Sequence, residues 1–168
     1  DGTASSTNDG PYYKTWQQVV NDGLAKLQAA YPTSTVKIAG ILWVQGESDI
    51  DAGSAAVSAY AANLTTFIAD VRATLGTPVP IFFSRISKSQ TVYSNPSDPD
   101  YANYLTLRAQ QQQVASNVPS AFLIDADTSS FTMNSDNLHF DAGGQLALGR
   151  AFAALMAEKL MLKVTKIQ

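Results

Sequence analysis

The chain contains a single histidine, His139, which follows Asp136 by three residues in an Asp-x-x-His segment. Imidazole is the one side chain that can accept and return a proton near neutral pH. A carboxylate that reaches the Nδ1 atom of the ring would fix its tautomer and stabilise the imidazolium. The pair therefore predicts a general base and its orienting acid, although a surface-loop histidine beside an unrelated aspartate would give the same pattern.

A second group of polar residues, Gln45-Gly46-Glu47, directly follows an apolar run. The side-chain amide of Gln45 needs hydrogen-bond partners at that place, and it is well suited as an N–H donor toward a developing oxyanion. Gly46 would let the backbone and a substrate approach closely. The acids that follow are either ordinary loop residues or residues that orient the site. Glu47, Asp49 and Asp51 could also bind a calcium ion. The twelve-residue ligand pattern with a terminal glutamate that such a site usually has does not follow, which argues against it.

The composition of the chain excludes several classes of protein. Its 168 residues suit one domain with a sizeable core, and 45% hydrophobic against 15% charged residues argue against disorder. The net charge is −3 and no basic run occurs, which argues against nucleic acid or an anionic membrane as the main partner. The chain has no cysteine, so disulfides, thiol catalysis and zinc–thiolate sites are excluded.

The pattern of apolar residues predicts helices that alternate with strands. Helices are expected over 15–30, 57–75, 101–118 and 142–162, strands over 36–44, 79–86 and 121–124, and loops over 1–12, 46–53, 87–99 and 125–137. We expect the strand over 36–44 to be buried on both faces and the run Gln110–Gln113 to be solvated. Such alternation is typical of βαβ units, which form a parallel sheet between two layers of helices.

The predicted topology places the two polar groups on one rim. Ligands of open parallel sheets lie beyond the carboxyl ends of the strands. Gln45 follows the first predicted strand, and both Asp136 and His139 lie in the loop after the third. Arg85 follows the second strand, where it would either clamp an acidic substrate or pair with a neighbouring carboxylate.

The segment from Trp43 to Asp49, together with Asp136-x-x-His139, resembles the SGNH hydrolase superfamily. The nearest branch is the sialate O-acetylesterase and acetyl xylan esterase type, whose corresponding block reads Trp-His-Gln-Gly-Glu-x-Asp. Val44 stands where that branch usually has histidine, which leaves the substrate preference open. The stretch from Gly2 to Trp16 is similar to the residues after the family's second block. The resemblance implies one domain over 1–168 with a three-layer α/β/α fold around a parallel sheet, of the SGNH or flavodoxin-like type.

The resemblance also implies roles for individual residues. His139 would be the base, Asp136 its orienter, and the side-chain amide of Gln45 a donor to the oxyanion. The backbone N–H of Gly2 would be a second oxyanion donor. The implied activity is that of a carbohydrate O-acetylesterase acting on acetylated sugars without a cofactor, and a secreted or periplasmic location follows from the resemblance alone.

The family's nucleophile is a serine in a Gly-x-Ser block at the end of the first strand. No Gly-Asp-Ser or Gly-Gln-Ser occurs in these 168 residues. Ser5, Ser6, Ser48 and Ser84 lack the strand-turn-helix elbow that exposes a nucleophilic Oγ. We therefore expect a carboxyl-terminal portion whose first strand or strands are missing. The fold could be completed in three ways: by a second chain or fragment that carries the serine, by a homodimer, or by a rearranged sheet. The alternative function is a non-catalytic carbohydrate-binding or structural remnant.

Overall fold

The computed structural model describes residues 10–127 and 131–164, and side chains as far as residue 160. The described elements are α1 (Pro11–Ala30), β1 (Ile41–Trp43), α2 (Glu47–Asp51), α3 (Ser54–Leu75), β2 (Ile81–Ser84), α4 (Thr91–Ser94), α5 (Tyr101–Asn117), β3 (Ala121–Ile124) and α6 (Ala142–Val164). Helices and strands alternate as the sequence predicts, and the loops over 46–53 and 87–99 each contain a short helix, α2 and α4, that the sequence analysis did not predict.

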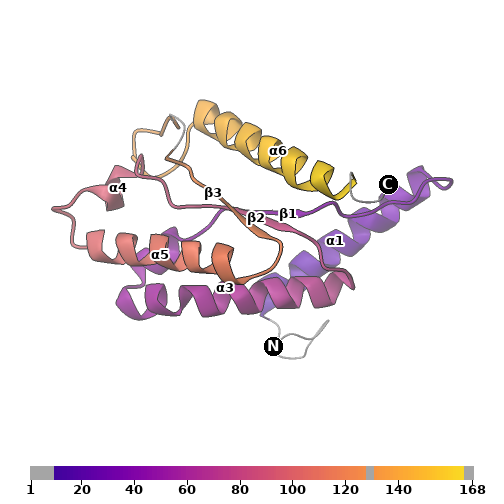
Figure 1. Cartoon of the computed structure of the whole chain (residues 1–168), viewed down its shortest axis with the longest axis horizontal. Coiled ribbons are helices and arrows are strands. Elements are labelled where there is room, and N and C mark those ends of the chain that lie inside the picture. The colour runs from indigo at the N-terminus through magenta and orange to yellow at the C-terminus, as the bar shows by residue number, and fades with distance from the viewer. Residues whose placement is uncertain (1–9, 128–130, 165–168) are drawn as a thin grey trace.

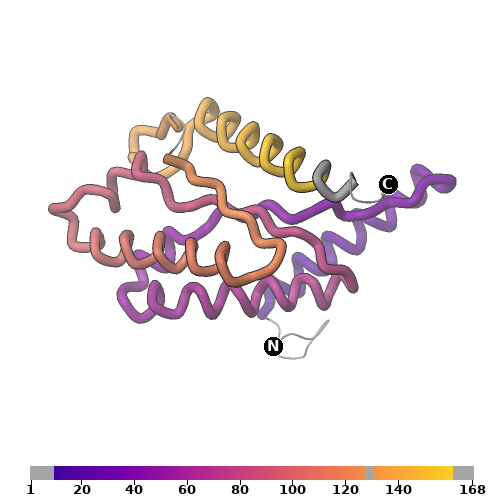
Figure 2. The backbone as a smooth tube through the Cα atoms, viewed as in Figure 1, coloured from indigo at the N-terminus to yellow at the C-terminus, as the bar shows by residue number. Residues whose placement is uncertain are grey.

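The three strands form one parallel sheet in the order β1-β2-β3. Helices α3 and α5 lie on one face of this sheet and α6 lies on the other (Figure 1). Figure 2 follows the same path, with the loop after β3 and the start of α6 at the end of the sheet where the strands finish. The described residues thus form the three-layer α/β fold that the sequence predicts.

Side chains of β2 alternate between two cores because successive residues of a strand point to opposite faces. Ile81 and Phe83 belong to the cluster between the sheet and α3/α5, which also includes Ile68 of α3. Phe82 belongs to the cluster under α6, together with Phe152. All four residues of β2 are buried, as expected for the central strand of a parallel sheet.

The first strand differs from its prediction in length and in burial. Ile41 N–H donates to the carbonyl of Pro80 at 3.0 Å, and pairing with β2 begins at residues 41 and 81 because Pro80 has no N–H to extend the ladder. Leu42 and Val44 are 50% and 47% exposed, so the prediction of burial on both faces was wrong. The reason is that β1 is an edge strand of the described sheet and no described helix covers Leu42.

The prediction that Gln110–Gln113 is solvated was also wrong for Gln111, which is fully buried. Its Oε1 accepts the backbone N–H of Ile86 at 3.0 Å. Its Nε2 donates to the carbonyls of Ser84 at 3.3 Å and Gln45 at 3.4 Å. A buried amide with these partners ties the ends of β1 and β2 together from α5.

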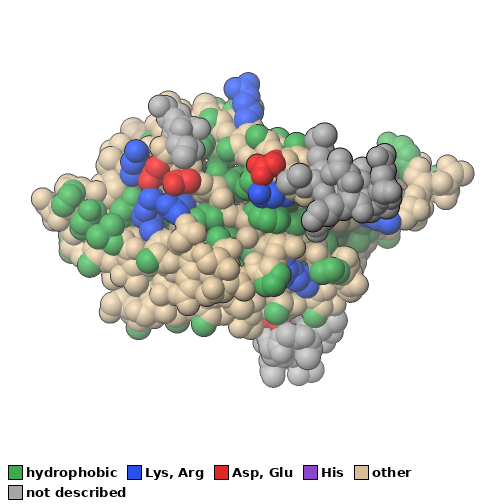
Figure 3. Space-filling model, viewed as in Figure 1, with side chains coloured by type: hydrophobic (Ala, Val, Ile, Leu, Met, Phe, Trp, Pro, Cys, Tyr) green, Lys and Arg blue, Asp and Glu red, His purple; other side chains and the backbone are tan. Residues whose placement is uncertain are grey.

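Helix α1 begins at Pro11 rather than at residue 15, because the fixed φ of proline suits the first position of a helix and its missing N–H is not needed there. The helix lies against α3, where the Tyr13 hydroxyl and the Thr74 hydroxyl are 3.0 Å apart. None of the helices in the described part of the chain is both long and apolar enough to cross a membrane. On the face shown in Figure 3, acidic and basic side chains lie next to each other rather than in patches of one sign.

Candidate active site

Asp136 and His139 meet in one tight turn. The Nδ1 atom of His139 lies 2.8 Å from Oδ2 of Asp136. The other carboxylate oxygen, Oδ1, accepts the backbone N–H groups of Leu138 at 2.9 Å and His139 at 3.0 Å. Asn137 has a φ of 55°, a left-handed conformation that asparagine tolerates better than most residues. The backbone N–H and the ring of His139, with the N–H of Leu138, lower the pKa of Asp136 to about 2, so the carboxylate is ionised at neutral pH.

A short hairpin presents the histidine to solvent. Met133 and Phe140 form an antiparallel bridge, and the N–H of Asn134 donates to the carbonyl of His139 at 2.8 Å. The His139 side chain is 70% exposed. Its Nε2 makes no hydrogen bond to any described residue, whereas Nδ1 is held by the carboxylate. The arrangement leaves Nε2 as the ring atom that can accept a proton from an incoming group.

The start of α6 supports this hairpin. Asp141 precedes the helix, and its Oδ1 accepts the N–H of Gly144 at 2.8 Å and the hydroxyl of Thr132 at 2.5 Å. Such a cap satisfies a helix N–H that has no partner within the helix. A Cβ at Gly144 would lie 2.2 Å from the carbonyl oxygen of Thr132. Only glycine therefore lets the hairpin come this close to the helix.

The segment after β1 is held in a conformation that requires glycine. Gly46 has a φ of 149°, and a Cβ there would lie 2.7 Å from Cδ2 of Leu107. The backbone carbonyl of Gln45 accepts a hydrogen bond from the hydroxyl of Tyr60 at 3.1 Å. The side-chain Nε2 of Gln45 donates to Oδ2 of Asp49 at 2.5 Å. Because an amide nitrogen carries two hydrogens, one N–H of Gln45 is used to orient the side chain and the second is left for another acceptor.

The acidic side chains of this segment do not converge. They accept hydrogen bonds from three different neutral donors: Glu47 from Gln90, Asp49 from Gln45, and Asp51 from Tyr93. Within residues 10–127 and 131–164, no group of three or more histidines, cysteines or acids is placed to hold a metal ion. The geometry of these acids is that of side chains that orient their neighbours.

Gln90 joins the two polar segments. Its Nε2 donates to Oε1 of Glu47 at 2.8 Å and to the carbonyl of Leu138 at 3.2 Å. The segment after β1 and the loop of His139 therefore meet at one rim, as the topology predicts. The sequence analysis did not identify Gln90, because a glutamine in a polar loop gives no signal that its side chain is buried.

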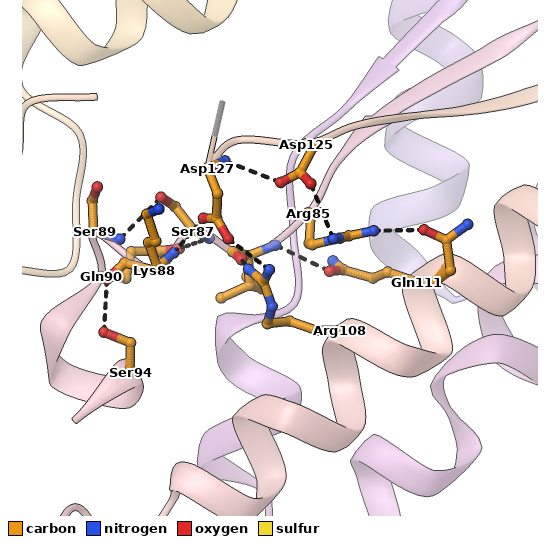
Figure 4. A network of polar contacts seen from close by, with 12 residues as sticks. Arg85, Ser87, Lys88, Ser89, Gln90, Ser94, Arg108, Gln111, Asp125 and Asp127 are labelled. Atoms are coloured by element: carbon orange, nitrogen blue, oxygen red, sulfur yellow. Dashed lines mark hydrogen bonds and ion pairs between the residues drawn. The ribbon is translucent and has the colours of Figure 1, made fainter. Parts of the chain in front are cut away.

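Two ion pairs hold the segment after β3, one from the end of β2 and one from α5 (Figure 4). Arg85 Nη1 lies 3.2 Å from Oδ2 of Asp125, and Arg108 Nη2 lies 2.6 Å from Oδ2 of Asp127. Arg85 thus pairs with a neighbouring carboxylate, which was one of its two predicted roles. These pairs fix the first residues after β3, 125–127.

Other residues considered from the sequence do not join the site. Gly2, Ser5 and Ser6 lie outside the described residues. Ser84 is 5% exposed within β2, and Ser48 lies in α2. Ser84 is thus buried inside a strand, and Ser48 is the second residue of α2, in the helix rather than in the turn at Gly46 that precedes it.

Comparison with known proteins finds a matching family model and similar solved structures. The family model described as "Carbohydrate esterase, sialic acid-specific acetylesterase" matches residues 5–158. The X-ray structure of a protein from Arabidopsis thaliana is similar with a TM-score of 0.69 and 21% sequence identity, over 90% of this chain and 54% of that one. The chain thus spans about half the length of that protein, and at this identity the likeness shows the fold. No curated protein matches significantly. The extent of the family match shows that the chain belongs to the carbohydrate esterases of the sialic acid-specific acetylesterase family.

Proposed function

We propose that this chain carries the general base of a serine-type esterase that removes acetyl groups from sugars. The observation that carries the proposal is the 2.8 Å contact between Nδ1 of His139 and the carboxylate of Asp136, beside an exposed Nε2. The ionised carboxylate favours the tautomer with its proton on Nδ1, which leaves the lone pair of Nε2 to accept the proton of a serine hydroxyl. Family membership supports acetyl-ester hydrolysis as the reaction class.

The proposed reaction has two halves. In the first, the serine Oγ attacks the acetyl carbonyl while Nε2 of His139 takes the hydroxyl proton. The second N–H of the Gln45 amide, and by family resemblance the backbone N–H of Gly2, would stabilise the oxyanion of the tetrahedral intermediate. His139 then returns the proton to the departing sugar oxygen. Water, activated by the same ring, attacks the acetyl-serine and releases acetate.

The serine itself would arrive on a further strand beside β1. Edge strands leave unpaired N–H and C=O groups, and folded proteins usually cover such edges. In the described sheet, β1 has a neighbouring strand on one side only. Leu42 within β1 and Val44 just after it are exposed, and Gln45 follows directly. We propose that a strand from outside these 168 residues, in a second chain or fragment, pairs with this edge and ends in the nucleophile.

An activity measurement with a site variant tests the proposal. A preparation that contains these 168 residues together with the polypeptide that carries the serine, and the same preparation with His139→Ala, would be compared on 4-methylumbelliferyl acetate and on an acetylated sugar, with circular dichroism to verify the fold. We expect wild-type turnover and its loss in the variant. Unchanged turnover by His139→Ala would refute the role of this base. Sugar binding without turnover by the wild type would instead favour the non-catalytic remnant, for which the absent Gly-Asp-Ser block is the motivating observation.

A further inference from the structure

The side chain of Gln90 forms hydrogen bonds to the segments after all three strands. It is 1% exposed. Its Oε1 accepts the N–H of Ser87, in the loop after β2, at 2.9 Å (Figure 4). Its Nε2 donates to Glu47, after β1, and to the carbonyl of Leu138, after β3. An amide has one carbonyl and two N–H groups, so these three bonds engage both amide hydrogens and the carbonyl.

The bond to Leu138 acts on the peptide group that leads into the histidine. The carbonyl of Leu138 and the N–H of His139 belong to one planar unit. Gln90 binds the oxygen of this unit at 3.2 Å, and Oδ1 of Asp136 binds its N–H at 3.0 Å. With both ends bonded, the plane cannot rotate without breaking one bond. The orientation of this plane determines where the His139 side chain leaves the backbone.

We propose that Gln90 is a positioning residue, which sets the place of His139 relative to the Gln45–Glu47 segment by holding the Leu138–His139 peptide. Its effect on catalysis rests on the proposed function, whereas its effect on the hairpin does not. The burial of Gln90 adds to the specificity of the contact, because a buried amide must find its hydrogen-bond partners within the protein.

The test separates the link to Leu138 from the stability of the fold. Gln90→Glu keeps the shape of the side chain but replaces its two donors with a carboxylate, beside Glu47. The exchanged pair Glu47→Gln/Gln90→Glu restores a donor and an acceptor between positions 47 and 90 but leaves the Leu138 carbonyl without a donor. Gln113→Glu makes the same chemical change at an exposed position of α5 and serves as the control.

Hydrogen exchange at the hairpin, together with thermal unfolding, gives the readout. We expect Gln90→Glu and the exchanged pair to lower the protection of the Asn134 and Asp141 amides by about tenfold or more. The exchanged pair should regain most of the melting temperature that Gln90→Glu loses, and Gln113→Glu should change neither quantity. In an active preparation, the exchanged pair should lower kcat with little change in KM.

Two results would overturn the inference. One is wild-type hairpin protection in both Gln90 variants. The other is recovery of hairpin protection in the exchanged pair, since the fold and not the bond to Leu138 would then hold the loop. If the wild-type protein hydrolyses no acetyl ester but the hydrogen-exchange protection of the variants is as expected, the proposed function fails and the positioning role of Gln90 stands.

Discussion

Replacing Asp136 with asparagine changes one atom that faces the histidine ring. The Oδ1 atom of an asparagine can still accept the N–H groups of Leu138 and His139, so the turn should keep its shape. The amide nitrogen would take the place of Oδ2, which lies 2.8 Å from Nδ1 of His139. Two N–H donors cannot face each other at that distance. The ring must therefore move its proton to Nε2 and present the lone pair of Nδ1 to the amide.

The expected loss of activity follows from this change of tautomer. A ring protonated on Nε2 cannot accept the proton of a serine hydroxyl there. The same substitution in the serine protease triad, where the geometry also survives, lowers kcat by about 10⁴, and we expect a loss of that order here. It corresponds to about 5 kcal/mol of lost transition-state stabilisation. Asp22→Asn, at an exposed position of α1, should leave turnover unchanged.

Nitrogen-15 NMR reads the tautomer directly, because the chain has only one imidazole to assign. In the wild type near pH 8 we expect the proton on Nδ1, and in Asp136→Asn we expect it on Nε2. Acetyl-ester hydrolysis by the same samples gives kcat and KM. The reasoning would be refuted by an Asp136→Asn variant that keeps the Nδ1–H tautomer, or by a variant with the Nε2–H tautomer whose kcat falls by less than about tenfold.

Three further predictions follow from the geometry. Gln45→Ala should lower kcat by roughly ten- to a thousandfold, and a change confined to KM would contradict an oxyanion role. Gly144→Ala should destabilise the fold by about 1–3 kcal/mol in thermal unfolding, because its Cβ would meet the carbonyl of Thr132 at 2.2 Å, whereas Gly149→Ala, with open space around it, should not. The lowered pKa of Asp136 means that this carboxylate stabilises the fold above about pH 4 and loses that effect as the pH falls toward 2. Acid unfolding of Asp136→Ala should therefore lack this part of the pH dependence, and an unchanged curve would argue against the contacts seen at this carboxylate.

Local signals were enough to predict most of the elements. β3 spans the four residues expected from its apolar run, and α3 ends before Gly76, as its glycine predicts. The Asp136–His139 contact is also local, since one turn of the chain brings the two side chains together. In each case the signal comes from residues within a few positions of one another in the sequence.

The features that the sequence analysis missed depend on contacts between distant segments. Gln111 is buried because its partners lie at or just after the ends of β1 and β2. Gln90 is buried because its partners follow all three strands. Hydrophobic patterning treats a glutamine as a surface residue and carries no information on such partners. The exposure of Leu42 was missed for a related reason. An apolar run is the same whether its strand is central or lies at an edge of the described sheet.

Labelling with a serine-directed fluorophosphonate tests the central claim most directly. The enzyme as isolated, and its His139→Ala variant, would be treated with the reagent, and the modified peptide would be located by mass spectrometry. We predict a labelled serine on a polypeptide segment outside these 168 residues, and at least about a hundredfold slower labelling in His139→Ala, the scale of general-base catalysis. Labelling of a serine within residues 1–168, or labelling at an undiminished rate in His139→Ala, would contradict the claim that His139 activates a nucleophile supplied by another strand.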